Sequence, residues 1–145
     1  MRSTNWKIPD GLCFLGSNGN MHSTDTLEQA QKEGRAPWSK IVYDLKDCVW
    51  YEDAYPVTEG HALIVPREAS QQNITKCFEL ALKIGNENIQ KGLIDGYNIG
   101  INMGAAAGQT CMYPHVHLSP RRTGDMMDPT GGVRHVIPHK GNYKK

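Results

Sequence analysis

The sequence predicts one α+β domain built on a five-stranded, mainly antiparallel sheet with one main helix. Three short runs rich in β-branched and aromatic residues follow one another between positions 41 and 66, with turn residues between them. A longer stretch with helical spacing comes next, and two more β-prone runs follow it. We expect irregular segments at both ends of the chain.

The first three strands are expected to form an antiparallel meander. They are I-V-Y-D-L (41–45), C-V-W-Y-E-D (48–53) and H-A-L-I-V-P (61–66), and the turn P-V-T-E-G precedes the third. Pro66 ends the third run, because proline cannot donate a hydrogen bond to a neighbouring strand.

An amphipathic helix is predicted from about residue 73 to 91. Apolar residues recur there at spacings of three and four, which places them on one face: Ile74, Cys77, Phe78, Ala81, Leu82, Gly85 and Ile89. Gly92 and Gly96 close the helix. Residues 97–102 are expected to form the fourth strand, and 113–120 the fifth, with a Gly/Ala loop between them.

Both ends of the chain are poor in regular patterns. The first 40 residues are rich in Gly, Ser, Asn and Thr, so we expect loops and short pieces there and no functional role. After Pro120, only V-R-H-V-I (133–137) has the pattern of a short strand, and this tail is expected to fold back on the domain. No repeat or low-complexity segment suggests a second domain within residues 1–145.

The charge, hydropathy and cysteine content of the chain exclude several classes of protein. The chain has 145 residues, a net charge of +1 and a mean hydropathy of −0.54, which argue against general binding to nucleic acids or membranes. No apolar run resembles a signal peptide or a membrane span, so we expect a cytoplasmic protein. The four cysteines are far apart and predict neither a disulfide framework nor a zinc knuckle.

The segment Y-P-H-V-H-L-S-P (113–120) contains the candidate catalytic residues. In a strand, Tyr113, His115, His117 and Ser119 would share one face, which we expect to border a cleft. The two histidines could be solvated, could bind a metal, or could act on phosphorus. No third and fourth ligand stands at a spacing typical of zinc sites. A neutral imidazole is a nucleophile at physiological pH, so we favour phosphoryl chemistry.

The preceding stretch N-M-G-A-A-A-G-Q-T (102–110) could be a plain turn or an anion site. Glycine and alanine let backbone N–H groups approach an anion, and polar side chains add further donors. The candidate donors are Asn102, Gln109 and Thr110.

Together these segments resemble the histidine triad (HIT) family of nucleotide hydrolases and transferases. The resemblance rests on N-x-G-x(3)-G-Q-T, the His-x-His strand and the P-R after it. Upstream, D-A-Y-P-V-T-E-G-H-A-L-I-V-P (53–66) is similar to the family's D-x-x-P-x-x-x-G-H-x-L-x-x-P, so the likeness covers about residues 40–122.

The resemblance implies a role for each matching residue. His115 corresponds to the nucleophile, and His117 to the residue that holds phosphate oxygens. Phosphate contacts are implied for Asn102, Gln109 and Thr110, and a contact with the ribose hydroxyls for Asp53. His61 is expected to support a neighbouring element, and Tyr113 replaces the first of the three histidines while its carbonyl orients His115.

The resemblance also implies activity, cofactors and partners. We expect a homodimer that hydrolyses a dinucleoside polyphosphate at the α-phosphate through a nucleotidyl-histidine, without a cofactor. Tyr113 and the C-F-L-G at 13–16 depart from the residues that hold zinc in some relatives, so no metal is expected. The segment P-R-R-T-G-D (120–125) resembles the fragile histidine triad branch of diadenosine polyphosphate hydrolases. Arg121, Arg122 and Arg134 could each be solvated surface residues, but as a group they would suit a long polyphosphate. Alternatives are a phosphoramidate hydrolase, a nucleotidylyl transferase, or a nucleotide-binding module without catalysis.

The tryptophans are expected to serve mainly the core. Trp50 lies in a predicted strand, whereas Trp6 and Trp38 lie in the irregular first part of the chain. One of them could supply a wall of a base pocket.

Overall fold

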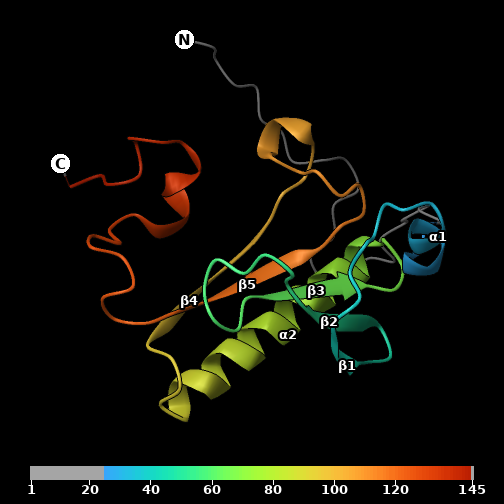
Figure 1. Ribbon diagram of the computed structural model, residues 1–145, viewed down its shortest axis with the longest axis horizontal. Helices are drawn as coiled ribbons and strands as arrows, with labels where there is room; N and C mark the ends of the chain where they lie inside the picture. Colours follow the sequence, from blue (N-terminus) through green and yellow to red (C-terminus); the bar gives the residue numbers. More distant parts are fainter. Residues whose placement is uncertain (1–24, 145) are drawn as a thin grey trace.

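The computed structural model describes residues 25–144, and its regular elements follow the chain in a simple order (Figure 1). They are α1 (Leu27–Lys32), β1 (Ile41–Asp44), β2 (Cys48–Glu52), β3 (Ala62–Pro66), α2 (Gln71–Gln90), β4 (Gly96–Ile101) and β5 (Val116–Arg121). Two short 3₁₀ helices, η1 (Ala105–Ala107) and η2 (Gly132–Val136), lie in the loops before and after β5.

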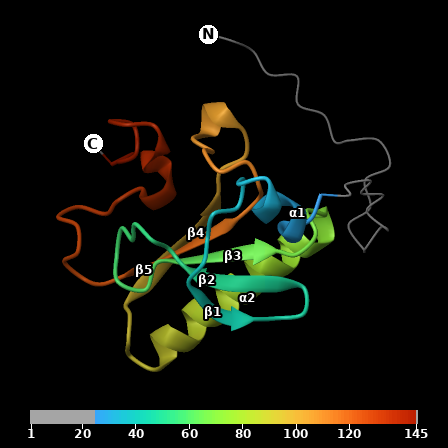
Figure 2. The ribbon, with the colours of Figure 1, turned by 45° about the vertical axis from the view of Figure 1, so that its right-hand side comes forward.

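The five strands form one sheet in the order β1-β2-β3-β5-β4, and every neighbouring pair is antiparallel (Figures 1 and 2). The meander of the first three strands is therefore as expected. β5 inserts between β3 and β4, so the histidine strand is central in the sheet, with Leu63 opposite His117. The predicted α+β class and antiparallel sheet are confirmed.

Helix α2 covers one face of the sheet. The side chain of Ser70 caps its first turn by accepting from the N–H of Asn73, and Gly92 follows its end with a φ of 73°. Its apolar stripe buries Cys77 and Ala81 completely against the inward side chains of β3 and β5. The predicted helix is confirmed, extended by two residues at its start.

A second core lies on the opposite face. It joins Leu27 and Ala30 of α1 to Tyr51 and Val65 of the sheet, and it encloses Tyr113. Helix α1 was not expected in the first part of the chain. It is only six residues long, and Thr26 caps it by accepting from the N–H of Gln29, so it depends on this packing more than on its own length.

Two strand predictions need correction. β5 begins at Val116, so Tyr113, Pro114 and His115 precede it in an irregular approach. Pro114 has no N–H for a ladder, and the N–H of Tyr113 bonds back to the carbonyl of Cys111 at 2.8 Å. The V-R-H-V-I segment is the 3₁₀ helix η2, because Gly131 and Gly132 enter it with positive φ and turn the chain.

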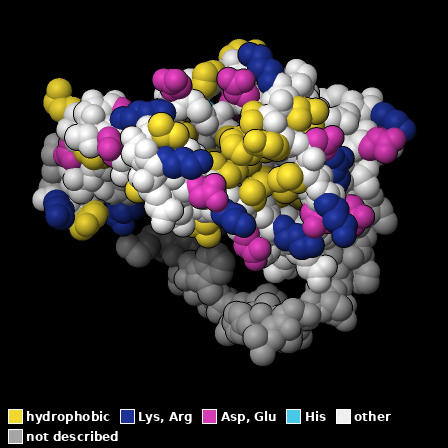
Figure 3. Space-filling model, turned by 90° about the horizontal axis from the view of Figure 1, so that it is seen from below, with side chains coloured by type: hydrophobic (Ala, Val, Ile, Leu, Met, Phe, Trp, Pro, Cys, Tyr) yellow, Lys and Arg dark blue, Asp and Glu magenta, His cyan; other side chains and the backbone are white. Residues whose placement is uncertain are grey.

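Seen from below, the side on which α2 lies, hydrophobic side chains gather near the middle of the surface with charged groups around them (Figure 3). On α2 and the turn after it, Leu82, Ile89 and Leu93 are all exposed. None of the helices between residues 25 and 144 combines the length and apolar character needed to cross a membrane.

Candidate functional site

A cavity of about 500 Å³ opens on the sheet face opposite α2. Most of the residues expected at the site line it: Asp53, Asn102, Thr110, His115 and His117. They come from the end of β2, the end of β4, the loop after η1 and the start of β5. The sheet order therefore brings together residues that are far apart in the sequence.

The alternation of β5 decides which side chains reach this cavity. Val116 and Leu118 are buried in the core beneath α2. His117 lies between them on the other face, where Leu63 of β3 also lines the cavity. The expected separation of apolar and histidine faces is thus present, and it extends to His115 just before the strand.

His115 is fixed by the backbone of Tyr113. Its Nδ1 lies 2.7 Å from the Tyr113 carbonyl oxygen, which can only accept, so Nδ1 carries the proton and Nε2 keeps its lone pair. The ring is 7% exposed. Burial lowers its pKa from 6.5, although the Tyr113 carbonyl and the charge of Asp53 act in the opposite sense. His115 is therefore neutral near pH 7, with a free nitrogen.

His61 and His117 form a second hydrogen-bonded pair. The N–H of Val57 donates to Nδ1 of His61 at 3.2 Å, so the proton of neutral His61 lies on Nε2. That Nε2 is 3.0 Å from Nδ1 of His117 and 3.4 Å from Oδ2 of Asp53. His61 thus donates to His117, and the single proton of neutral His117 must lie on its Nε2.

This Nε2 of His117 has no hydrogen-bond partner within the described chain and is fully buried. The pKa of His117 is lowered to about 4, mainly by burial and also by the neighbouring His115 and His61, against the charge of Asp53. His117 therefore presents a neutral N–H donor beside the cavity. A buried donor without a partner is costly unless a ligand accepts from it.

Asp53 is held at the edge of the cavity by its own turn. Its Oδ1 accepts from the N–H of Tyr55 at 2.7 Å, and its backbone N–H donates to the carbonyl of His61 at 3.0 Å. The carboxylate is half-buried and lines the cavity with remaining capacity to accept hydrogen bonds.

The Gly/Ala loop differs from the expected anion cradle. The N–H groups of Ala107, Gly108 and Gln109 all donate within the loop, to carbonyls of Gly104 and Ala105. The Gln109 side chain accepts from the N–H of Gly104 at 2.8 Å and donates to the Cys111 carbonyl at 3.1 Å. Gln109 is not among the residues lining the cavity. The loop is braced internally, and its phosphate contact through Gln109 stays a prediction.

Tyr113 points away from the cavity into the second core. Its side chain is completely buried, and its hydroxyl donates to the carbonyl of Pro66 at 2.6 Å. Burial raises the pKa of this phenol, so it stays protonated and keeps donating. The side chain therefore links the approach to β5 with the end of β3, while its carbonyl holds His115.

A metal does not suit the described histidines. Asp53, His61 and His117 offer atoms within 4.8 Å of one another. However, Nδ1 of His61 already accepts from Val57, so a metal on Nε2 would require an unprotonated ring. Tyr113 at the first triad position is a buried donor to Pro66 rather than a ligand. The Cys13 to Gly16 segment lies outside the described residues.

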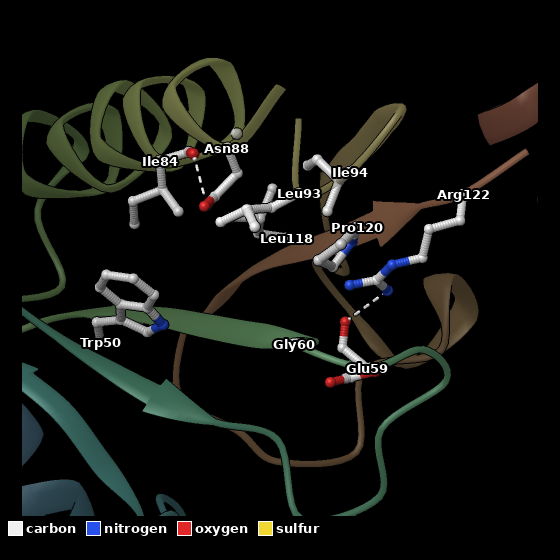
Figure 4. Close-up of a pocket in the computed structure, with 11 residues that line it drawn as sticks. Trp50, Glu59, Gly60, Ile84, Asn88, Leu93, Ile94, Leu118, Pro120 and Arg122 are labelled. Atoms are coloured by element: carbon white, nitrogen blue, oxygen red, sulfur yellow. Dashed lines mark hydrogen bonds between the residues drawn. The ribbon is translucent and has the colours of Figure 1, made fainter. Parts of the chain in front are cut away.

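The three arginines do not line this cavity, contrary to expectation. Arg121 forms a paired contact with Asp125, and Arg134 bonds the carbonyls of Lys140 and Gly141. Arg122 donates to Thr58 at 3.0 Å and to the carbonyl of Glu59 at 2.8 Å. It borders a separate cavity of about 520 Å³ between α2 and the sheet, close to Pro120 (Figure 4).

The segment Pro37–Lys40 lines the histidine cavity, although the first 40 residues were expected to have no functional role. Trp38 lies against His115, with ring centroids 4.6 Å apart. The only signal in the sequence was the tryptophan itself, which suggested that one of the three tryptophans could form a pocket wall. Trp50 serves the core beneath α2 instead, and Trp6 lies outside the described residues.

Curated proteins of known activity resemble this chain. The adenylylsulfatase HINT3 of Arabidopsis thaliana is 30% identical over 65% of this chain and 51% of that protein. The asymmetrical bis(5'-nucleosyl)-tetraphosphatase of Schizosaccharomyces pombe is 28% identical over 62% of this chain and 53% of its own length. The chain thus spans about half the length of each enzyme.

Solved structures share the fold. A zinc-bound histidine triad family protein from Mycobacterium smegmatis has a TM-score of 0.59 at 25% identity, covering 70% of this chain and 78% of the other. SMU.412c from Streptococcus mutans has a TM-score of 0.55 at 31% identity, covering 88% and 83%. The family model for the HIT domain matches residues 35–124, which include both histidines and the loop before them. The chain belongs to the HIT family.

Proposed function

We propose that the protein hydrolyses a nucleotide at its α-phosphate through a covalent intermediate on His115. The observation that carries this proposal is the complementary pair in the cavity. His115 has a free nitrogen lone pair, and His117, whose ring centroid is 5.1 Å away, has an N–H donor without a partner. A nucleophile beside a donor suits attack on phosphorus and stabilisation of the charged oxygen.

The reaction proceeds in two displacements. Nε2 of His115 attacks the α-phosphorus, and the bond from phosphorus to the leaving group breaks with its electron pair. The Nδ1–H bond to the Tyr113 carbonyl stabilises the charged ring that results. Water then attacks phosphorus, the P–N bond breaks with its electron pair returning to Nε2, and the proton lost by water passes to the solvent or to the departed leaving group. A nucleoside monophosphate is released.

The other residues would orient the substrate. His117 donates to a non-bridging oxygen, and Asn102 and Thr110 stand across the cavity for further phosphate contacts. Asp53 would accept from the ribose hydroxyls, since a carboxylate can receive both. Gln109 would act through the shape of its loop, because both ends of its amide are bonded there.

The first candidate substrate is a dinucleoside polyphosphate, which the likeness to the fission yeast tetraphosphatase supports. A second candidate is a nucleotide with a small leaving group, such as an adenylyl sulfate or a phosphoramidate. Two observations favour it: the likeness to the Arabidopsis adenylylsulfatase, and the absence of Arg121, Arg122 and Arg134 from the cavity wall. Nucleotidylyl transfer would follow if another acceptor replaced water.

Steady-state turnover of diadenosine tetraphosphate, adenosine phosphoramidate and adenylyl sulfate tests the proposal. We expect release of adenosine monophosphate from at least one of them, and loss of that release in H115A with nucleotide binding retained. H139N, at an exposed histidine, is the matched control and should keep the wild-type rate. Binding without turnover in the wild type would show a nucleotide-binding module instead.

We further propose a homodimer that joins two sheets. β4 is an edge strand in the sheet order, and its residues Gly96–Ile101 are only half-buried. Sedimentation equilibrium should give twice the chain mass of 16.2 kDa at the concentrations used for turnover. A monomer with full activity would contradict this part of the proposal.

A further inference from the structure

The ring of Trp38 packs directly on the His115 ring. The two ring centroids are 4.6 Å apart and the planes are tilted by 50°. Trp38 also contacts Tyr51, with centroids 6.2 Å apart, and packs against the second core. It is therefore anchored by the core on one side and lies on the catalytic ring on the other.

His115 depends on such a contact for its orientation. Within residues 25–144, the polar anchor of its ring is the Nδ1 bond to Tyr113, which holds one edge of the ring. Trp38 and His117 contact the ring at 4.6 and 5.1 Å between centroids. His117 is bonded to His61, whereas Trp38 is an apolar ring in direct contact with His115.

We propose that Trp38 is a positioning residue that holds the His115 ring and shields it from water. The proposal rests on the function proposed above for His115. Aromatic pairs of this geometry contribute beyond their buried area, and a small displacement of a nucleophile costs rate steeply. Trp38 acts through His115, so a substitution of Trp38 should change kcat by changing the position and the pKa of the His115 ring.

Burial is also the main reason that the pKa of His115 lies below 6.5. The titratable groups near its ring are Asp53, His117 and, behind His117, His61. The other titratable side chains that line the cavity are Lys40, Glu52, Tyr55 and Cys111. Trp38 carries no charge, so its removal changes solvation without changing these charges. The pKa of His115 should then rise toward its ordinary value when Trp38 is truncated.

The test uses the full chain with W38A, W38F and W50F. The control Trp50 packs beneath α2 on the opposite face of the sheet. NMR titration of the His115 ring, assigned from its absence in H115N, gives its pKa without any substrate. The pH dependence of turnover gives the acid limb of the rate profile, where the rate falls as His115 is protonated. We expect W38A to raise the pKa, to move the acid limb by the same amount, and to lower kcat about tenfold. W38F and W50F should stay within about threefold of wild type.

An unchanged pKa and acid limb in a folded W38A would overturn the proposal. If W38A does not fold, W38V keeps part of the apolar volume in the core and should shift the same two quantities in the same direction. Failure of the wild type to form a nucleotidyl-histidine would contradict the proposed function. The NMR titration would still report on the contact between Trp38 and His115.

Discussion

Single hydrogen bonds determine where the protons lie in the cavity. The Val57 N–H fixes the tautomer of His61, His61 fixes that of His117, and the Tyr113 carbonyl fixes that of His115. His115 and His117 therefore present ring nitrogens in different protonation states to a ligand, although they are the same residue type two positions apart. One offers a lone pair and the other offers an N–H, whereas their roles as nucleophile and phosphate-oxygen ligand stay a prediction.

The titration of His117 should be visible in stability. Its pKa is about 4 in the folded chain against 6.5 as the ordinary value, so the unfolded chain takes up the proton first. The stability linked to neutral His117 is complete above pH 6.5 and is lost as the pH falls toward 4. H117N keeps an acceptor for His61 and does not titrate, so it should lose less free energy of unfolding across this interval.

Chemical denaturation of both proteins between pH 7 and 4 measures this difference. His61 and His115 titrate in both chains, so their contributions largely cancel in the comparison. Parallel loss of stability in the two proteins would show that His117 does not have the depressed pKa.

The Tyr113 hydroxyl should matter for stability and little for catalysis. Y113F leaves the buried Pro66 carbonyl without its donor, which should cost about 1–3 kcal/mol in free energy of unfolding. The backbone carbonyl that holds His115 remains. Y51F is the control, because the Tyr51 hydroxyl only accepts a longer bond of 3.2 Å from Gln31. A tenfold fall in kcat of Y113F at full stability would contradict this assignment.

Individual elements position the site through close approaches that the sequence pattern did not reveal. Helix α1 holds the approach to β5, because Arg35 just after it donates to the Met112 carbonyl at 2.8 Å and to both oxygens of Asp25 at 3.0 Å. The contact between Arg35 and Met112 joins residues 77 positions apart. Periodicity within a short window cannot report them, which is why α1 and the wall at Trp38 were missed.

Helix α2 and strand β4 meet at Gly85. A Cβ at this position would lie 2.5 Å from the Tyr97 ring, so the ring would have to move. We expect G85A to lower the free energy of unfolding by about 1–2 kcal/mol, since overpacking outweighs the gain in helix propensity. In a Y97L background the same change should be neutral or stabilising. A destabilisation of equal size in both backgrounds would rule out the contact with Tyr97.

At the scale of the whole molecule, the sheet separates two cavities. The strand order and the alternation of β5 put His117 on one face and Leu118 on the other, where Leu118 lines the cavity beside α2. The meander of β1 to β3 and the alternation of β5 could be predicted from the sequence, because turn residues and alternation are local. The insertion of β5 between β3 and β4 could not, because it depends on pairing between distant segments. The positions of the arginines could not, since Arg122 is drawn to Thr58 and Glu59 by folding contacts across the molecule.

This placement predicts how the protein treats substrates of different length. R122A should lower stability, because it removes two hydrogen bonds to the loop before His61. It should leave the ratio of kcat/KM for diadenosine triphosphate and tetraphosphate unchanged, since Arg122 is outside the cavity. A selective loss with the tetraphosphate would place Arg122 on the path of the phosphate chain.

The covalent intermediate on His115 is the central claim, and acid-quench mass spectrometry tests it most directly. The wild-type chain and H115N are each mixed with a labelled dinucleoside polyphosphate, or with an adenylyl sulfate, and then quenched and digested. We expect a nucleotidyl mass on the wild-type peptide that contains His115, absent in H115N and turned over by water on a chase. Turnover without any such adduct, or an adduct on another residue, would contradict it.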